Sequence, residues 1–295
     1  MANVAFIGLG IMGFPMAGHL AVKGGHRVVV YNRTAARSAE WLKRFNGVSA
    51  STPAEAAQGA EVVFTCVGND ADLRSVTLGA QGCLPSLAPG TVLVDHTTAS
   101  AAIAQELDRA CQVKGCRFMD APVSGGQSGA ENGTLSVMCG AEAETFDKVQ
   151  DLLSGSYAAK IGLMGPVGSG QLAKMVNQIC IAGVVQGLSE GLSFARGAGL
   201  DPALVVEVIS KGAAQSWQME NRYKTMLADH FDHGFAVEWM RKDLAICLDE
   251  ARRGGLSLPL TALVDQFYAE VEAMGGRRWD TSSLFARTEK LRGKP

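Results

Sequence analysis

The stretch Val4-Ala5-Phe6-Ile7-Gly8-Leu9-Gly10-Ile11-Met12-Gly13 decides the fold of the first part of the chain. Its apolar start predicts a buried strand over Val4–Gly8, and the glycine pattern follows directly and opens a helix. In such a turn the first glycine makes the tight bend, the second lets a pyrophosphate approach the backbone, and the third lets the helix pack closely on the strand. Unpaired N–H groups at the helix start then face the phosphates. The stretch therefore predicts a dinucleotide-binding turn.

The end of the next predicted strand, Arg27–Tyr31, indicates which dinucleotide is bound. Sites that prefer NAD usually carry Asp or Glu there, which accepts hydrogen bonds from the ribose 2′-hydroxyl. This chain has Asn32-Arg33-Thr34 instead. No carboxylate repels a 2′-phosphate, and Arg33 can form a charge-assisted contact with it. The alternative is that Arg33 is an arginine of a solvated loop. The pattern favours NADP(H) and leaves NAD(H) as the alternative cofactor.

Short apolar or β-branched runs alternate with helical stretches up to residue 163, which is the pattern of βαβ units. Several runs are apolar throughout, as expected of strands that are buried on both faces. We therefore predict an α/β fold for residues 1–163: a Rossmann-type, doubly wound and mostly parallel sheet. The predicted strands are Val4–Gly8, Arg27–Tyr31, Glu61–Val67, Thr91–Asp95, Cys116–Asp120 and Thr134–Cys139.

The pattern changes after Gly162, and no convincing strand follows. A joint rich in turn residues precedes a stretch that can form one long helix from Ser169 to about Gly199. We predict an all-helical second domain over residues 164–295, joined to the first through this helix. Small residues recur at every fourth position along the helix, which lets another helix or backbone approach closely: Gly183, Gly187, Gly191 and Ala195.

Composition argues against several classes of partner. The formal net charge is −2, with 47% hydrophobic and 19% charged residues, so no general attraction to nucleic acid or to an anionic membrane is expected. The most apolar late run, Met175 to Leu188, contains three amides and is too short to span a bilayer. Seven scattered cysteines without a CxxC pair predict reduced thiols and a cytoplasmic protein. His230 and His233 lack a third ligand, so no metal site is predicted.

Two segments are candidates for substrate chemistry. In the first, Asp120–Gly126, Ser124 offers a hydroxyl, and Gly125 and Gly126 leave backbone N–H groups unshielded, which suits a small carboxylate. Read alone, this segment can equally be a simple tight loop. The second segment, Gly170–Gln178, opens the long helix.

On that helix Lys174, Asn177 and Gln178 stand at i, i+3 and i+4 and share one face. The ammonium of Lys174 can polarise a substrate carbonyl and give up a proton as a hydride arrives. In the reverse direction a neutral Lys174 is the base, which requires a lowered pKa. By spacing alone, a solvated helix lysine is the more ordinary interpretation. Lys242, in Lys242-Asp243-Leu244, likewise reads as part of an ordinary charge pair on a helix surface.

These segments occur in a fixed order along the chain. There are four blocks: Gly8–Gly13 with Pro15-Met16-Ala17; Asp120–Gly126, continuing to Gly129 and Gly133-Thr134-Leu135; Gly170–Gln178; and Lys242-Asp243-Leu244. Together they resemble the β-hydroxyacid dehydrogenase (3-hydroxyisobutyrate dehydrogenase) family, over nearly the whole chain. Four blocks in sequence are far more specific than any one of them.

The resemblance implies a role for each block. Lys174 matches the catalytic lysine of the family, and Ser124, Gly125 and Gly126 match its carboxylate-binding loop. Asn177 matches its substrate-orienting amide, and Gln178 beside it is likewise expected to bind the substrate. Gln178 stands where many relatives carry a second asparagine, and Gly68 where many carry proline. The implied cofactor contacts are Gly8, Leu9, Gly10, Ile11, Met12, Gly13, Asn32, Arg33, Thr34, Val67, Gly68, Thr98 and Lys242.

The implied activity is hydride transfer between NAD(P) and a small β-hydroxy acid or its semialdehyde, by a homodimer or homotetramer assembled through the helical domains. The stretch Asn32-Arg33-Thr34 resembles members that reduce glyoxylate or succinic semialdehyde with NADPH, which is the alternative within the class. Imine reductases share the architecture but generally lack the lysine. A dinucleotide-binding module without turnover is the alternative of another class, and the presence of Lys174 argues against it.

Overall fold

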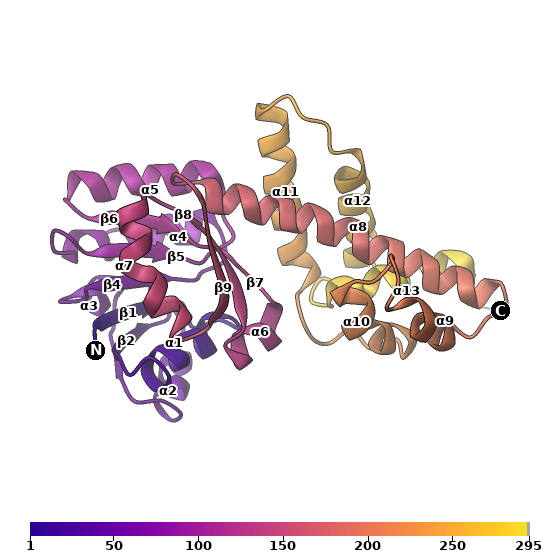
Figure 1. Cartoon of the computed structure of the whole chain (residues 1–295), viewed down its shortest axis with the longest axis horizontal. Helices are drawn as coiled ribbons and strands as arrows, with labels where there is room; N and C mark the ends of the chain where they lie inside the picture. Colours follow the sequence, from indigo (N-terminus) through magenta and orange to yellow (C-terminus); the bar gives the residue numbers. More distant parts are fainter. Residues whose placement is uncertain (294–295) are drawn as a thin grey trace. The chain divides into compact units, whose positions relative to one another are not determined.

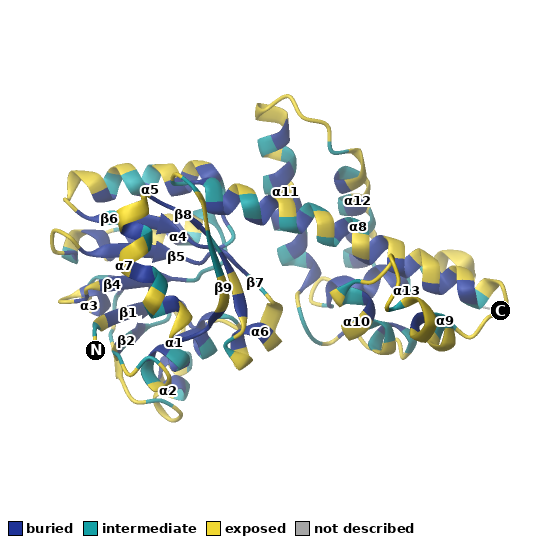
Figure 2. Cartoon of the chain, viewed as in Figure 1, coloured by how far each residue is buried: buried dark blue, intermediate teal, exposed yellow. Residues whose placement is uncertain are grey.

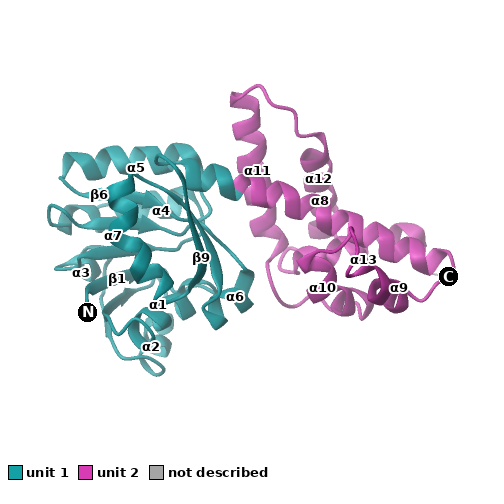
Figure 3. Ribbon diagram, in the orientation of Figure 1, with its two compact units in different colours: residues 1–174 teal, residues 175–295 magenta. Residues whose placement is uncertain are grey.

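The computed structural model describes residues 1–293, and it divides the chain into two compact units (Figure 3). The first unit is Met1–Lys174, and the second begins at Met175. This boundary falls inside helix α8 (Ser169–Gly197), so one continuous helix contributes to both units.

Unit 1 is built on one sheet in the order β3-β2-β1-β4-β5-β6-β8-β7, with β9 also paired to β8 (Figure 1). The pairs from β3 to β6 are all parallel, and β8 is antiparallel to β6 and to β7. The predicted mostly parallel sheet is confirmed. The strands are β1 (Asn3–Ile7), β2 (Arg27–Tyr31), β3 (Val48–Ser49), β4 (Val62–Thr65), β5 (Val92–Asp95), β6 (Arg117–Asp120), β7 (Val123–Ser124), β8 (Leu135–Gly140) and β9 (Ala158–Gly165).

The sequence pattern does not predict three of these strands. β3 and β7 have two residues each, too few to show a periodicity. β9 carries Lys160 and two glycines and is mostly exposed or half-buried, so it lacks the apolar run of a buried strand.

Helices cover both faces of the sheet, and each face has its own apolar cluster (Figure 2). Alternate residues of β1 separate the two: Phe6 packs in one cluster with Leu20 of α1, and Ile7 in the other with Leu107 of α5. The helices of unit 1 are α1 (Gly13–Val22), α2 (Ala35–Leu42), α3 (Pro53–Ala57), α4 (Asp70–Leu78), η1 (Leu84–Ser86), α5 (Ala101–Val113), α6 (Gly126–Asn132) and α7 (Ala143–Ser154), followed by the first turns of α8.

Unit 2 is helical over its described residues, apart from one isolated bridge between Ala236 and Asp280. The predicted all-helical second part is thereby confirmed. Side chains of α8 enter both apolar clusters of this unit: Val185 packs with α11 and α12, and Leu192 packs with α10 and α13. The other helices are α9 (Pro202–Ile209), α10 (Trp217–Leu227), α11 (Val237–Arg253), α12 (Pro259–Ala273), η2 (Thr281–Ser283) and α13 (Leu284–Arg292). Within residues 1–293, none of the helices is both long and apolar enough to span a membrane.

Candidate active site

The glycine-rich turn after β1 has the shape that a pyrophosphate needs. Gly8 has a φ of +104°, and a Cβ there would lie 2.2 Å from the carbonyl oxygen of Cys66. A Cβ at Gly13 would lie 2.0 Å from the carbonyl oxygen of Gly8. Around Gly10, in contrast, nothing lies within 4 Å of the Cβ position. Close backbone packing therefore requires glycine at positions 8 and 13. Gly10 leaves open space at the start of α1, where the pyrophosphate of a dinucleotide would fit.

The segment after β2 is hydrogen-bonded to the glycine-rich turn. Asn32 accepts a hydrogen bond from the backbone N–H of Leu9 at 2.9 Å, and its amide donates to the carbonyl of Thr34 at 3.0 Å. Arg33 is highly exposed, with 84% of its side-chain surface accessible, and pairs with Asp72 at 3.0 Å. Exposed pairs of this kind contribute little to stability, so Arg33 can exchange Asp72 for another anion at small cost.

Arg37 is a neighbour of the turn that the sequence pattern does not single out. Its Nε donates to the carbonyl of Leu9 at 3.2 Å, and its Nη1 pairs with Glu40 at 2.8 Å. Its guanidinium lies 4.8 Å from the centre of the Phe14 ring. The spacing Arg33-x-x-x-Arg37, with the second arginine in the first turn of α2, is the only signal in the sequence that could have indicated it.

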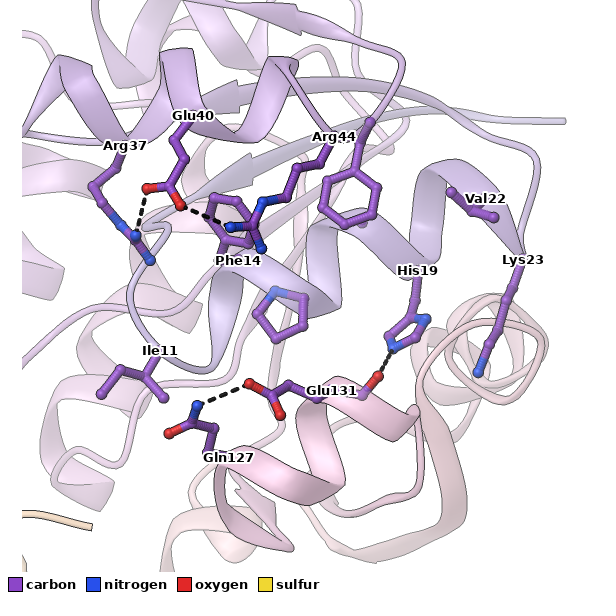
Figure 4. A pocket seen from close by; sticks show the side chains of 13 residues that line it. Ile11, Phe14, His19, Val22, Lys23, Arg37, Glu40, Arg44, Gln127 and Glu131 are labelled. Carbon is purple, nitrogen blue, oxygen red and sulfur yellow. Dashed lines mark hydrogen bonds and ion pairs between the residues drawn. The ribbon is translucent and has the colours of Figure 1, made fainter. Parts of the chain in front are cut away.

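A cavity of about 540 Å³ lies beside this turn. Figure 4 shows its lining residues, which come from α1, α2 and α6 and their flanks. Ile11 and Arg37 line the part next to the glycine-rich turn, and Lys23 lies further along α1. None of the residues predicted to bind substrate lines it. The predicted substrate-binding residues therefore do not form this cavity.

The ends of β4 and β5 carry a buried polar cluster next to the predicted cofactor contacts Val67, Gly68 and Thr98. The Asp95 carboxylate accepts hydrogen bonds from the Thr65 hydroxyl at 2.7 Å and from the Thr97 N–H at 3.1 Å. The Thr97 hydroxyl in turn accepts from the N–H of Val67 at 3.1 Å. Burial raises the pKa of Asp95 to about 7, against the effect of these hydrogen bonds.

His96 lies in the same cluster but is not available for acid–base chemistry. Its Nδ1 is 2.6 Å from the carbonyl of Ala121, which only accepts, so Nδ1 carries the proton. Its Nε2, 2.7 Å from the Tyr157 hydroxyl, then accepts from that hydroxyl. Burial lowers the pKa of His96 to about 4. The ring is a neutral structural element.

Asp120, at the end of β6, holds the start of α8. Its two carboxylate oxygens accept from the backbone N–H of Gly168 at 2.7 Å and of Gln171 at 2.8 Å. A Cβ at Gly140 would lie 2.5 Å from one oxygen, and a Cβ at Gly170 would lie 2.8 Å from the other. Burial raises the pKa of Asp120 to about 6, and the backbone hydrogen bonds oppose that rise. The strand end therefore fixes the helix that carries Lys174.

The loop Ser124-Gly125-Gly126 connects β7 to α6. Gly125 has a φ of +132° and Gly126 a φ of +60°, a region that side chains disfavour. Both glycines are exposed, and nothing lies within 4 Å of the Cβ position of Gly126. The backbone of this loop is therefore accessible, as a carboxylate-binding loop requires.

Lys174 is buried, with only 7% of its surface exposed. The interpretation as a solvated helix lysine is therefore wrong. Helical spacing brings Asn177 and Gln178 to the same face of α8, one turn further on.

Gln178 is also buried, and its side chain is engaged within unit 2. Its amide nitrogen donates to Asp243 at 2.5 Å, and its oxygen accepts from the Asn177 amide at 2.8 Å. Asp243 pairs with Lys242 at 3.0 Å. Because a carboxylate only accepts, Asp243 fixes the orientation of the Gln178 amide, and Gln178 in turn fixes that of Asn177.

The predicted residues thus form two groups, one in each unit. In unit 1 the predicted cofactor contacts follow the ends of four strands that are neighbours in the sheet. The glycine-rich turn follows β1, Asn32–Thr34 follow β2, Val67-Gly68 follow β4, and Thr98 follows β5. In unit 2 Asn177, Gln178 and Lys242 belong to one hydrogen-bonded cluster with Asp243. Among residues 1–293 there is no group of three His, Cys, Asp or Glu side chains that could hold a metal ion.

Comparison with known proteins gives matches over both parts of the chain. Residues 3–165 match the family model described as the NAD-binding domain of 6-phosphogluconate dehydrogenase. Residues 168–287 match the model described as NAD-binding of NADP-dependent 3-hydroxyisobutyrate dehydrogenase.

Individual relatives agree with these models. An uncharacterized oxidoreductase of Shewanella frigidimarina is 63% identical, covering 99% of this chain and 100% of that protein. The 2-hydroxy-3-oxopropionate reductase of Escherichia coli is 34% identical over 98% of both chains. Among solved structures, the 3-hydroxyisobutyrate dehydrogenase of Mycobacterium tuberculosis with L-serine has a TM-score of 0.87 at 29% identity, covering 99% of this chain and 100% of that one.

Proposed function

This chain belongs to the β-hydroxyacid dehydrogenase family, and on that premise we propose that it transfers a hydride between NADP(H) and a small β-hydroxy acid or its semialdehyde. It is an NAD(P)-dependent oxidoreductase that acts on a hydroxyl group. The observation that carries the proposal is the buried Lys174 on α8, a helix whose start is fixed by the Asp120 carboxylate.

In the proposed reaction Lys174 is the general acid and base. During reduction, its ammonium donates a hydrogen bond to the substrate carbonyl oxygen and gives up a proton to the alkoxide as it forms. During oxidation, the neutral amine takes the hydroxyl proton. When bound, the dihydronicotinamide would supply the hydride. Val67, Gly68 and Thr98, which follow β4 and β5, would hold the cofactor, and the same role is proposed for Lys242 of α11.

The substrate carboxylate is assigned to the loop Ser124-Gly125-Gly126, whose exposed backbone supports this role. Asn177 orients the substrate through its amide. Gln178, given its bonds to Asn177 and Asp243, acts in the site by holding the Asn177 amide in one orientation.

Selection of NADP(H) over NAD(H) is assigned to Arg33. The exposed Arg33 and the absence of a carboxylate at residues 32–34 support it, and the pair with Asp72 is weak enough to be exchanged for a 2′-phosphate. Reduction of glyoxylate or succinic semialdehyde with NADPH is the second candidate reaction.

The experiment that tests this function is a panel of small β-hydroxy acids, their semialdehydes and glyoxylate, each assayed with both nicotinamides. We expect oxidation of NADPH with at least one aldehyde-acid, faster than oxidation of NADH. A protein that binds NADPH in a fluorescence titration but oxidises it with no member of the panel would instead be a binding module without turnover.

We also propose that the protein is a homodimer or homotetramer in the cytoplasm. Exposed apolar side chains along α8 and α9 support assembly, with Phe194 at 74% and Val208 at 80% of their surface accessible. The proposed compartment rests on the seven scattered cysteines, which form no CxxC pair. Light scattering at micromolar concentration should give at least twice the mass of one chain, 31.0 kDa. A single-chain mass would contradict the proposed assembly.

A further inference from the structure

Gln171 is a buried glutamine in the first turn of α8 that binds the backbone on both sides of Thr98. Its side-chain oxygen accepts from the N–H of Ala99 at 3.0 Å, and its side-chain nitrogen donates to the carbonyl of Thr97 at 2.7 Å. Only 1% of the residue is exposed. Because the Ala99 N–H only donates and the Thr97 carbonyl only accepts, the amide has one orientation.

The backbone of Gln171 is fixed as well. Its N–H donates a hydrogen bond to the Asp120 carboxylate. That carboxylate lies so close to Gly140 and Gly170 that neither position has room for a side chain. Asp120 and Asp95 are register partners at the ends of the neighbouring strands β6 and β5. One residue therefore connects the end of β6, the segment after β5 and the start of α8.

Gln171 lies close in the chain to Lys174, and its side chain binds the backbone on both sides of Thr98. Lys174 lies three residues further along α8, about one helical turn away and on the same side of the helix. Thr98, the residue assigned to the cofactor, lies between the two peptide groups that Gln171 holds. The same side chain thus ties the cofactor segment to the helix turn that carries the proton donor.

We propose that Gln171 is a positioning residue that sets the separation between residues 97–99 and Lys174. This inference rests on the proposed catalytic role of Lys174. Hydride and proton must be delivered to two adjacent atoms of one carbonyl group, so the cofactor and the amine need a fixed separation. An error of about 1 Å in such a separation costs up to about 100-fold in rate.

The test compares Gln171→Leu with Gln186→Leu. Leucine is similar in size to glutamine but leaves the Ala99 N–H and the Thr97 carbonyl without their partner. Gln186 is the matched control, because it is also buried on α8 and bonds to Glu190 of the same helix. With the substrate that the wild type reduces best, we expect Gln171→Leu to lower kcat by about 10- to 100-fold. Its KM and its Kd for NADPH should change by less than about threefold, and Gln186→Leu should keep a near-normal kcat.

A second variant separates positioning from simple loss of packing. Gln171→Glu keeps the acceptor for Ala99 but, when ionised, sets an oxygen against the Thr97 carbonyl. When protonated, the same carboxyl can donate to that carbonyl. The ratio of its kcat to that of the wild type should therefore rise as the pH falls. The nearby carboxyls of Asp95 and Asp120 titrate in both proteins, so the ratio reports how the carboxyl introduced at position 171 changes the pH response.

Hydrogen exchange provides a readout that does not depend on turnover. The Ala99 amide should exchange faster in Gln171→Leu than in the wild type and in Gln186→Leu. Unchanged exchange at Ala99, an unchanged kcat in Gln171→Leu, or a pH-independent ratio for Gln171→Glu would each overturn the inference. A wild type that reduces no member of the panel would contradict the proposed function instead, while the exchange at Ala99 would still show whether Gln171 holds the segment.

Discussion

The buried carboxylates of the two units are stabilised in different ways. In unit 1, Asp95 and Asp120 lie at strand ends and accept hydrogen bonds from backbone N–H groups and, for Asp95, from the Thr65 hydroxyl. In unit 2, the buried carboxylates Asp243 and Glu289 lie within helices, and each pairs with a cation. Asp280, at the start of η2, combines both kinds of partner: it accepts from the N–H groups of Phe235 and Ser282 and pairs with Arg222.

The difference follows from what the backbone can offer. Where a strand ends and a helix begins, several N–H groups have no partner in secondary structure and can converge on a carboxylate. Within a helix nearly every N–H is already bonded to a carbonyl, so a buried carboxylate there needs side-chain partners. Hydrogen bonds from backbone N–H groups and a hydroxyl offset only part of the burial penalty, which is why the pKa of Asp95 rises to about 7 and that of Asp120 to about 6.

The largest expected effect comes at Lys174, on the helix that the unit 1 carboxylate Asp120 fixes. Lys174→Ala should lower kcat by about 1000-fold, because it removes the proposed general acid and base. Binding of NADPH, measured by fluorescence titration, should change little, since Lys174 is not among the residues proposed to hold the cofactor. Lys160→Ala, at an exposed lysine of β9, is the control. Near-normal turnover in Lys174→Ala would remove this lysine from the mechanism.

The comparison of carboxylates can be tested directly on stability. Asp120→Asn should destabilise the protein by about 2 kcal/mol, because one amide N–H would face a backbone N–H that cannot move away. Asp243→Asn should cost about half as much, because its side-chain partners Lys242 and Gln178 can reorient. Urea unfolding of both variants measures the two costs. Equal costs would mean that backbone and side-chain partners stabilise these groups alike.

In unit 1, the cation for which we propose a specific role is Arg33, in binding the 2′-phosphate. Arg33→Ala should weaken NADPH binding by about 10-fold or more, the loss of a charge-assisted contact, and leave NADH binding nearly unchanged. Arg27→Ala, also exposed, controls for a general loss of positive charge. If both cofactors lose affinity equally, the 2′-phosphate is not recognised at this position.

The smallest expected effect is the pH dependence that Asp95 causes. Its pKa is about 7 in the folded protein against an ordinary value of 3.8, so the folded state binds this proton more tightly than the unfolded state does. Stability from this group is therefore present below about pH 4 and is lost as the pH rises towards 7. Asp95→Asn should reduce the fall in melting temperature between pH 5 and pH 8, by a few degrees at most. Parallel curves for variant and wild type would contradict the raised pKa.

The sequence determined the features that local patterns encode. The glycine-rich turn, the apolar strands of a mostly parallel sheet and the long helix that begins at Ser169 follow from periodicity and from glycine spacing. The i, i+3, i+4 spacing likewise assigned Lys174, Asn177 and Gln178 to one helix face, because a helix has a fixed repeat.

Tertiary structure alone decided how these residues are held. Spacing cannot show that Lys174 is buried, that Asp120 caps α8 from 48 residues away, or that Gln171 binds the backbone around Thr98. Gln178 was assigned to the substrate from resemblance, but its partner Asp243 lies 65 residues further along the chain. Such contacts join residues that meet only when strands and helices pack, so no local repeat in the sequence encodes them.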